Sequence, residues 1–255
     1  MFVRSQSFGP ATIAKRVWRR SAKLRRMKYL WRRKLSEGLP AWARRLLGPA
    51  GCYLDMLFLD HGVFRLIYAN QHRLGERAWR SGQPAPYHVG VLARQGLRTV
   101  VNLRGARTCG SYLLEKIACE RRGITLIDFK IRSRVAPARE EIKAAAELFQ
   151  RIEYPMLLHC KSGADRVGLM SVLYRFLVEG VPLMEAKQQL SLRYGHSRQG
   201  SSGVLDHFFE CYIDDNRLRP MPFLDWIDKV YDPQELQSSF RGRGSRLPNR
   251  MLRQQ

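Results

Sequence analysis

The chain has 255 residues, enough for one or two domains, and its 45 Lys and Arg against 22 Asp and Glu give a formal net charge of +23. Five Cys, an odd number without framework spacing, argue against a disulfide scaffold and favour a reducing compartment. There is no Cys-x2-Cys pair or His cluster, so we expect no metal site, and the charges within residues 53–68, the best candidate span, exclude a membrane helix.

The positive charge is concentrated at the two ends of the chain. Residues 1–36 carry 12 Lys and Arg, residues 238–255 carry five Arg, and neither segment holds an acidic residue. We therefore expect a basic N-terminal arm at 1–50, a folded domain at 51–237 and an Arg-rich, disordered tail at 238–255. With no secretory signal in the sequence, we expect a cytoplasmic protein.

The N-terminal arm has the spacing of an amphipathic helix. If each residue turns the helix by about 100°, the apolar residues of the arm fall near one line along the helix surface, interrupted by Arg20. These apolar residues are Ile13, Val17, Leu24, Met27, Trp31 and Leu35. A basic helix with Trp on its apolar face suits an anionic membrane, so we expect peripheral association with the inner membrane face. Two alternatives stay open: an arm that packs on its own domain or is disordered, and, with less support, one that binds nucleic acid.

After the arm, short apolar runs alternate with helical patterns. The predicted strands lie near 63–68, 78–81, 99–103, 124–130 and 155–159. The predicted helices span 86–95, 111–122, 138–151, 166–179, 183–193 and 203–214. This alternation predicts an α/β fold with a central, mostly parallel sheet flanked by helices on both faces. Ligands bind such sheets at the carboxyl ends of the strands.

The most informative stretch follows the last predicted strand. An apolar run from Pro155 to Leu158 leads into His159 and Cys160, and the next helix, apolar on nearly every face, begins at Arg166. Gly163 gives the intervening loop the conformational freedom that inward-turned backbone amides require. The sequence therefore places a nucleophile and a cationic side chain at opposite ends of a tight loop between a strand and a helix.

This loop is suited to binding an anion. We expect the backbone amides of Lys161, Ser162, Gly163, Ala164, Asp165 and Arg166, with the positive helix end, to bind phosphoryl oxygens, and the Arg166 guanidinium to bind two of them. The same field stabilises a nucleophilic thiolate at Cys160, and His159 supports the loop through hydrogen bonds. A second Cys-x5-Arg spacing, at Cys211, contains two adjacent Asp and no Gly, so we discard it.

The pattern His159-Cys160-x2-Gly163-x2-Arg166 resembles the signature of the cysteine-dependent protein tyrosine and dual-specificity phosphatase superfamily. It is most similar to the compact atypical dual-specificity phosphatases of bacteria, plants and fungi, from about Arg80 to Tyr212, with further similarity in segments 80–84, 96–105 and 123–127. The resemblance implies a protein tyrosine phosphatase-like fold and hydrolysis of phosphate monoesters through a cysteinyl-phosphate. It implies neither a metal nor an organic cofactor.

The general acid is less clear from the sequence. The family implies an Asp on a separate loop, and Asp128 lies 32 residues before Cys160, but within a predicted strand; the following loop, 130–137, has no acid. Asp165 resembles the acid proposed for the Cys-x4-Asp-Arg loops of myotubularin-like and Sac-type lipid phosphatases. We therefore favour Asp165 over Asp128. Alternatively, Asp165 caps the following helix.

Two further features bear on activity. Val167 stands where the superfamily has Ser or Thr, which implies slow breakdown of the phosphoenzyme, and we expect Arg104, Arg132 and Arg134 near the entrance. The expected substrate is a phosphorylated protein, with a phospholipid or inositol phosphate at a membrane surface as the alternative. A catalytically weak phosphate-binding adaptor and a rhodanese-like sulfurtransferase also stay open.

Deleting residues 1–36 should weaken sedimentation with vesicles rich in anionic lipid, because each basic side chain near such a surface contributes about 1 kcal/mol. Binding of the full chain should fall as salt rises, since salt screens these charges. Hydrolysis of a soluble aryl phosphate should stay nearly unchanged and serves as the control. Equal vesicle binding by the full and the truncated chain would show that the arm is no membrane anchor.

Overall fold

A computed structural model describes Tyr53 and residues 69–245 of the chain. The expected arm at 1–50 and the strand expected near 63–68 lie outside these residues, as does the end of the tail from 246. In the described part, no helix is both long enough and apolar enough to cross a membrane.

The described residues form one five-stranded sheet. Its strands are β1 (His72–Arg73), β2 (Ala78–Ser81), β3 (Thr99–Asn102), β4 (Thr125–Asp128) and β5 (Met156–His159). The order is β1-β2-β5-β3-β4, in which β1 pairs antiparallel with β2 and all other pairs are parallel. The predicted, mostly parallel sheet is confirmed, and the short β1 is an addition. Because β5 lies between β2 and β3, its carboxyl end is surrounded by neighbouring strand ends.

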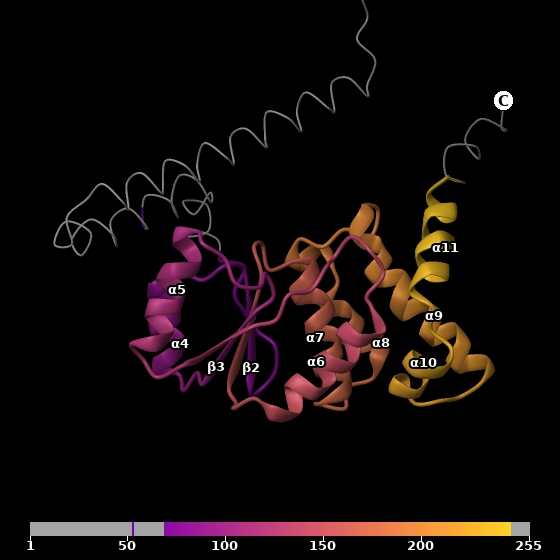
Figure 1. The fold of residues 1–255 in the computed structure, drawn as a ribbon. Coiled ribbons are helices and arrows are strands. Elements are labelled where there is room, and N and C mark those ends of the chain that lie inside the picture. The colour runs from indigo at the N-terminus through magenta and orange to yellow at the C-terminus, as the bar shows by residue number, and fades with distance from the viewer. Residues whose placement is uncertain (1–52, 54–68, 246–255) are drawn as a thin grey trace, which may run out of the picture. The chain divides into compact units, whose positions relative to one another are not determined.

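Helices cover both faces of the sheet (Figure 1). On one face, α4 (Pro86–Arg94) and α5 (Gly110–Glu120) form a small core with the side chain of Leu157. On the other, α6 (Arg139–Arg151) and α7 (Asp165–Leu177) pack in a larger core with Met156 and Leu158. Successive β5 side chains thus enter opposite cores, as the two-residue period of a strand requires. This two-sided burial explains the continuous apolar run in the sequence.

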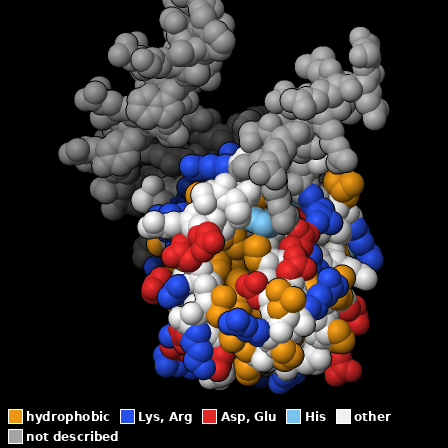
Figure 2. Space-filling model, turned by 90° about the vertical axis from the view of Figure 1, so that its right-hand side faces the viewer, with side chains coloured by type: hydrophobic (Ala, Val, Ile, Leu, Met, Phe, Trp, Pro, Cys, Tyr) orange, Lys and Arg blue, Asp and Glu red, His pale blue; other side chains and the backbone are white. Residues whose placement is uncertain are grey.

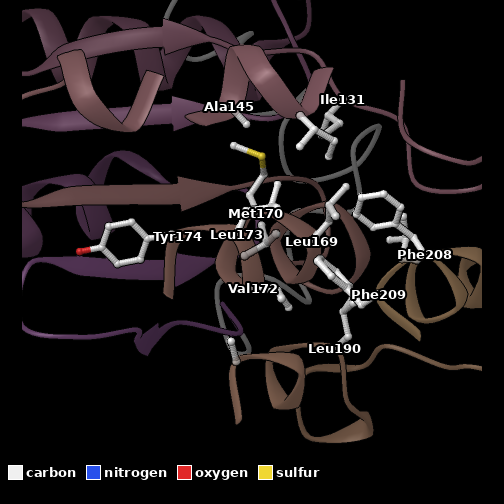
Figure 3. Packing of buried hydrophobic residues seen from close by; sticks show 14 of the residues in the cluster. Ile131, Ala145, Leu169, Met170, Val172, Leu173, Tyr174, Leu190, Phe208 and Phe209 are labelled. Carbon is white, nitrogen blue, oxygen red and sulfur yellow. The ribbon is translucent and has the colours of Figure 1, made fainter. Parts of the chain in front are cut away.

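The helix α7 is enclosed on nearly all sides, as its sequence predicts. Figure 3 shows its side chains Leu169, Met170 and Leu173 among residues from several other elements, including Ile131, Ala145, Leu190, Phe208 and Phe209. A Cβ at Gly168 would lie 2.5 Å from a methyl carbon of Leu190, so this glycine permits the close approach of the chain after α7. Dense packing on this scale holds the start of α7 in a fixed position.

The C-terminal third differs from the sequence prediction. The helix expected at 183–193 is only α8 (Leu183–Ala186), followed by the short 3-10 turns η2 (Lys187–Gln189) and η3 (Leu192–Tyr194). A further 3-10 turn, η4 (Ser201–Gly203), precedes α9 (Val204–Leu218). After α8 the turn continues as η2 and ends at Leu190, where ψ is 79°, outside the helical range.

Two helices follow that the sequence prediction did not contain, α10 (Phe223–Lys229) and α11 (Pro233–Ser245). The expected boundary of a disordered tail at 238 is therefore wrong, since residues 238–245 are helical. The physical reason is apolar contact: Leu236 is buried, and the Phe240 ring lies 6.0 Å from the ring of His207.

The surface of the described part is mixed in charge. On the face shown in Figure 2, Lys and Arg side chains alternate with Asp and Glu side chains around a hydrophobic strip. This agrees with the sequence, in which all 22 acidic residues lie between Glu37 and Glu235. The described side chains on this face therefore do not form a single positive patch.

Candidate functional site

The loop Cys160–Ala164 joins β5 to α7, as the sequence predicts. The Cys160 side chain is buried, and the Gly163 amide donates to its sulfur at 3.3 Å. A backbone donor aimed at sulfur, close to the N-terminus of a 13-residue helix, stabilises negative charge on that atom. The geometry thus fits a nucleophilic sulfur enclosed by the loop.

Three loop carbonyl groups point away from this sulfur and are bound from outside. The Lys161 carbonyl accepts from the backbone N–H of Gln83 at 3.2 Å. The Ser162 carbonyl accepts from the side-chain amide of Asn70 at 2.9 Å. The Gly163 carbonyl accepts from the Arg80 guanidinium at 2.8 Å. Because the C=O and N–H of a trans peptide point in opposite directions, these bonds turn the following amides inward. An array of inward amides is a binding site for a tetrahedral anion.

Arg80, at the centre of β2, is fully buried beneath the loop. Besides Gly163, its guanidinium donates to the carbonyl and side-chain oxygens of Gln189 at 2.8 and 2.7 Å and lies 3.8 Å from the Tyr194 ring centroid. Burial lowers the pKa of Arg80 to about 10, although the neighbouring Tyr194 and Cys160 act to raise it. The side chain is therefore a cation at neutral pH and adds positive charge beside the loop.

Gly163 has a conformation and surroundings that exclude a side chain. Its φ is +78°, in the left-handed region, and a Cβ there would lie 2.7 Å from the Gly82 nitrogen and 2.8 Å from the Ser81 carbonyl carbon. The loop thus rests directly on the backbone that follows β2.

His159 belongs to a buried polar chain. Its Nε2 lies 2.6 Å from a carboxylate oxygen of Glu115, whose other oxygen accepts from the Gln83 side chain at 2.7 Å. The side-chain oxygen of Gln83, Oε1, accepts in turn from the Arg104 guanidinium at 2.5 Å. His159 and Glu115 are both fully buried. This chain fixes the residue before Cys160.

The structure corrects the expected position of Arg104, which is buried rather than exposed at an entrance. Arg132 and Arg134 are exposed, and Arg132 lies 3.7 Å from Glu141. Arg166 is partly buried at the second position of α7 and donates to the Leu103 carbonyl at 3.4 Å.

Both candidates for the general acid, Asp128 and Asp165, lie at or after the carboxyl ends of strands in the sheet. Asp128 ends β4 and is exposed; its carboxylate accepts from the Asn102 amide at 2.7 Å and from the Tyr112 hydroxyl at 2.6 Å. Burial and this contact raise the pKa of Tyr112 to about 12, so the hydroxyl remains a donor. In register, Asn102 pairs with both Asp128 and His159, which places Asp128 two strands from the loop.

Asp165 is the first residue of α7, and its Oδ1 lies 2.8 Å from Nδ1 of His196. The helix cap is Ala164, which makes no side-chain cap bond, so the capping interpretation of Asp165 is wrong. Its carboxylate is held by a residue 31 positions away instead.

Other sequence features are placed as follows. Cys211 and Arg217 lie within α9, so the second Cys-x5-Arg spacing forms no loop. Val167 is fully buried in the core. The four Cys of the described part are free, and that part holds no group of three or more His, Cys, Asp or Glu able to hold a metal ion.

The model of the protein family described as "DSP-PTPase phosphatase fused to NAD+ Kinase" matches residues 68–204, more than half of the chain. The chain belongs to this phosphatase family. It is a cysteine-dependent phosphatase of the protein tyrosine and dual-specificity type, which favours hydrolysis over the sulfurtransferase alternative. The match includes the loop, Arg80, Glu115 and His196.

Solved structures similar to this phosphatase include TpbA from P. aeruginosa, at 18% identity and a TM-score of 0.46, covering 68% of this chain and 91% of that one. Another is the core catalytic domain of the PP-IP phosphatase SIW14 from S. cerevisiae, at 16% identity and a TM-score of 0.44, covering 60% and 96%. No curated protein matches the chain.

Gly163→Ala should abolish vanadate binding by the phosphatase and destabilise the fold, as measured by isothermal titration calorimetry and urea unfolding. The matched control is Gly180→Ala, at a similar φ of +67° but with no atom within 4 Å of the added Cβ. Both variants carry backbone strain of about 1–2 kcal/mol. Only Gly163→Ala adds the backbone clash, about 1–3 kcal/mol more. Equal stability and retained binding in the two variants would contradict the close backbone contact.

Proposed function

We propose that the chain hydrolyses phosphate monoesters through a cysteinyl-phosphate on Cys160, with phosphorylated protein as its substrate. The observation that carries the proposal is the hydrogen bond from the Gly163 amide to the Cys160 sulfur, in a loop whose carbonyl groups are held outward. This geometry supports a loop already formed for an anion before substrate arrives.

In the proposed first step, the loop amides from Lys161 to Arg166 and the Arg166 guanidinium hold the phosphoryl oxygens. The Cys160 thiolate then attacks phosphorus, so that the S–P bond forms as the bond to the leaving oxygen breaks. Donors fixed in place stabilise the charge that spreads over the phosphoryl oxygens, without reorganisation during the reaction. His159 and its buried partners keep the sulfur in line.

The leaving oxygen requires a proton, and Asp165 is the proposed donor. Its position next to Arg166 puts the carboxyl group at the loop itself, and its side chain is 29% exposed, which allows contact with a bound ester. Asp128 is the alternative, since it is exposed at the same sheet edge. In the second step water replaces sulfur on phosphorus. With the buried Val167 in place of a hydroxyl, we expect this step to be slow.

The surroundings of the loop favour substrates with additional negative charge. Lys130, Arg132 and Arg134 are exposed on the segment after β4, whose carboxyl end lies at the edge that carries the loop. These side chains suit acidic flanking residues in a phosphoprotein. They also suit a phosphorylated lipid headgroup or an inositol phosphate, which the basic arm would favour if it holds the enzyme peripherally on the cytoplasmic side of a membrane.

Cys160→Ser should abolish hydrolysis of an aryl phosphate and retain vanadate binding, because the hydroxyl is a poor nucleophile while the loop amides remain. Steady-state kinetics and titration calorimetry measure the two properties separately. Cys211→Ser, within α9, is the matched control and should keep full activity. Undiminished turnover by Cys160→Ser would rule out the covalent mechanism.

Asp165→Asn should lower turnover of an alkyl phosphate by about 10²–10⁴ but affect p-nitrophenyl phosphate far less, because a good leaving group needs no proton. Asp128→Asn is measured in parallel on both substrates. If the leaving-group dependence follows Asp128 instead, the assignment of the acid is reversed.

A further inference from the structure

Behind Asp165, the structure holds an imidazole between two carboxylates. His196 is 1% exposed, with its Nδ1 2.8 Å from Asp165 Oδ1 and its Nε2 2.7 Å from Asp206 Oδ2. Asp206 is also buried, on the first turn of α9, and Arg198 Nε lies 3.4 Å from its other oxygen. Both ring nitrogens therefore face an acceptor, which is the arrangement expected of an imidazolium.

The segment that carries His196 is fixed against the loop. A Cβ at Gly195 would lie 3.8 Å from the Cβ of Ala164, and the Tyr194 carbonyl accepts from the same Asn70 amide group that binds the Ser162 carbonyl. The Tyr194 ring also covers the Arg80 guanidinium. The contacts that shape the loop thus also set the distance between His196 and Asp165.

The charge of His196 follows from these neighbours. Burial by itself lowers the pKa of His196, but the hydrogen bonds and charges of Asp165 and Asp206 outweigh it and raise the pKa to about 9. The other charged group at this cluster, Arg198, interacts with Asp206 and with Glu210. At neutral pH the imidazole is consequently protonated and lies one hydrogen bond away from the proposed acid.

We propose that His196 is a positioning residue that stores the proton delivered by Asp165, with Asp206 holding the imidazolium from the opposite side. This inference rests on the proposed function, in which Asp165 is the general acid. His196 can supply the proton that Asp165 passes to the leaving oxygen, because its Nδ1 lies 2.8 Å from the Asp165 carboxyl group.

The proton balance closes over the two steps. As the S–P bond forms and the ester P–O bond breaks, the leaving oxygen takes a proton from Asp165, which takes one from His196, leaving the imidazole neutral. In the second step, water forms a bond to phosphorus as the S–P bond breaks and the thiolate returns. The proton released as the product becomes hydrogen phosphate passes through Asp165 to His196. The starting charges are restored, and no other reactant is required.

His196→Gln tests this relay, because glutamine keeps an amide donor but does not titrate. On phenyl phosphate we expect kcat/KM to fall about 10-fold to 100-fold, less than for loss of the acid itself, with p-nitrophenyl phosphate far less affected. The pH profile gives a second readout. Wild-type activity on phenyl phosphate should fall as the pH rises through about 9, when His196 loses its proton, and this fall should move to lower pH in the variant. His207→Gln, at a buried histidine bonded to Ser239, is the matched control.

Asp206→Asn keeps the proposal testable if His196→Gln fails to fold. Removing one carboxylate should lower the pKa of His196 and shift the alkaline fall by about 1–3 pH units to lower pH, while p-nitrophenyl phosphate turnover at pH 6 is retained. An unchanged alkaline fall and unchanged leaving-group dependence in a folded variant would overturn the relay.

If Cys160→Ser in the same series is inactive and binds vanadate, the proposed function stands even though the relay fails. If Cys160→Ser is fully active, the proposed function itself has failed.

Discussion

The carbonyl groups of the loop after β5 must be bound from outside for its amides to face inward, and much of the molecule follows from this requirement. The donors are Asn70 before β1, and Arg80 and Gln83 on and after β2. The short antiparallel strand β1 begins shortly after Asn70, and its pairing with β2 brings Asn70 to the loop. Because these donors already hold the loop in one conformation, little further conformational entropy is lost when an anion binds to it.

Arg80 connects the loop to the C-terminal third of the chain through its hydrogen bonds. A buried guanidinium needs several acceptors, and it finds them on Gln189 and on the loop, with the Tyr194 ring against its face. A regular helix continuing to residue 193 would use the Gln189 carbonyl for its own hydrogen bonds. The break after α8 and the irregular segment up to η4 are thus consistent with the demands of one buried cation.

The sequence predicted well those features that depend on neighbouring residues. The strand β5, the loop and α7 form one continuous stretch, and each carries its own sequence signal: a short apolar run, a glycine, and a helix that is apolar on nearly every face. The alternation of strands and helices was enough for the sheet and its two covered faces. Where the prediction was wrong, in the helix expected at 183–193 and in the tail, contacts with distant parts of the chain decide the structure.

The buried charged groups around the loop could not be predicted for the same reason. Glu115 lies in an amphipathic helix and has no local mark of burial, yet it is fully buried against His159. Arg80 and Gln189 are 109 residues apart, and His196 and Asp165 are 31 apart. A buried charge is recognised only through its partner, and a single sequence does not show partners. Two signals were present: the similarity of segment 80–84 to known phosphatases, and an Asp beside Arg166.

The contact of Gly163 with the backbone at Gly82 limits how such an enzyme can change its specificity. In the proposed mechanism, the phosphoryl group is bound by loop backbone and one guanidinium, so this surface recognises charge and tetrahedral shape and carries little information about the alcohol half of an ester. Within the loop, the exposed side chains are those of Lys161 and Ser162. Discrimination between one phosphorylated partner and another must therefore arise at the rim, where substitutions can accumulate without disturbing the chemistry beneath.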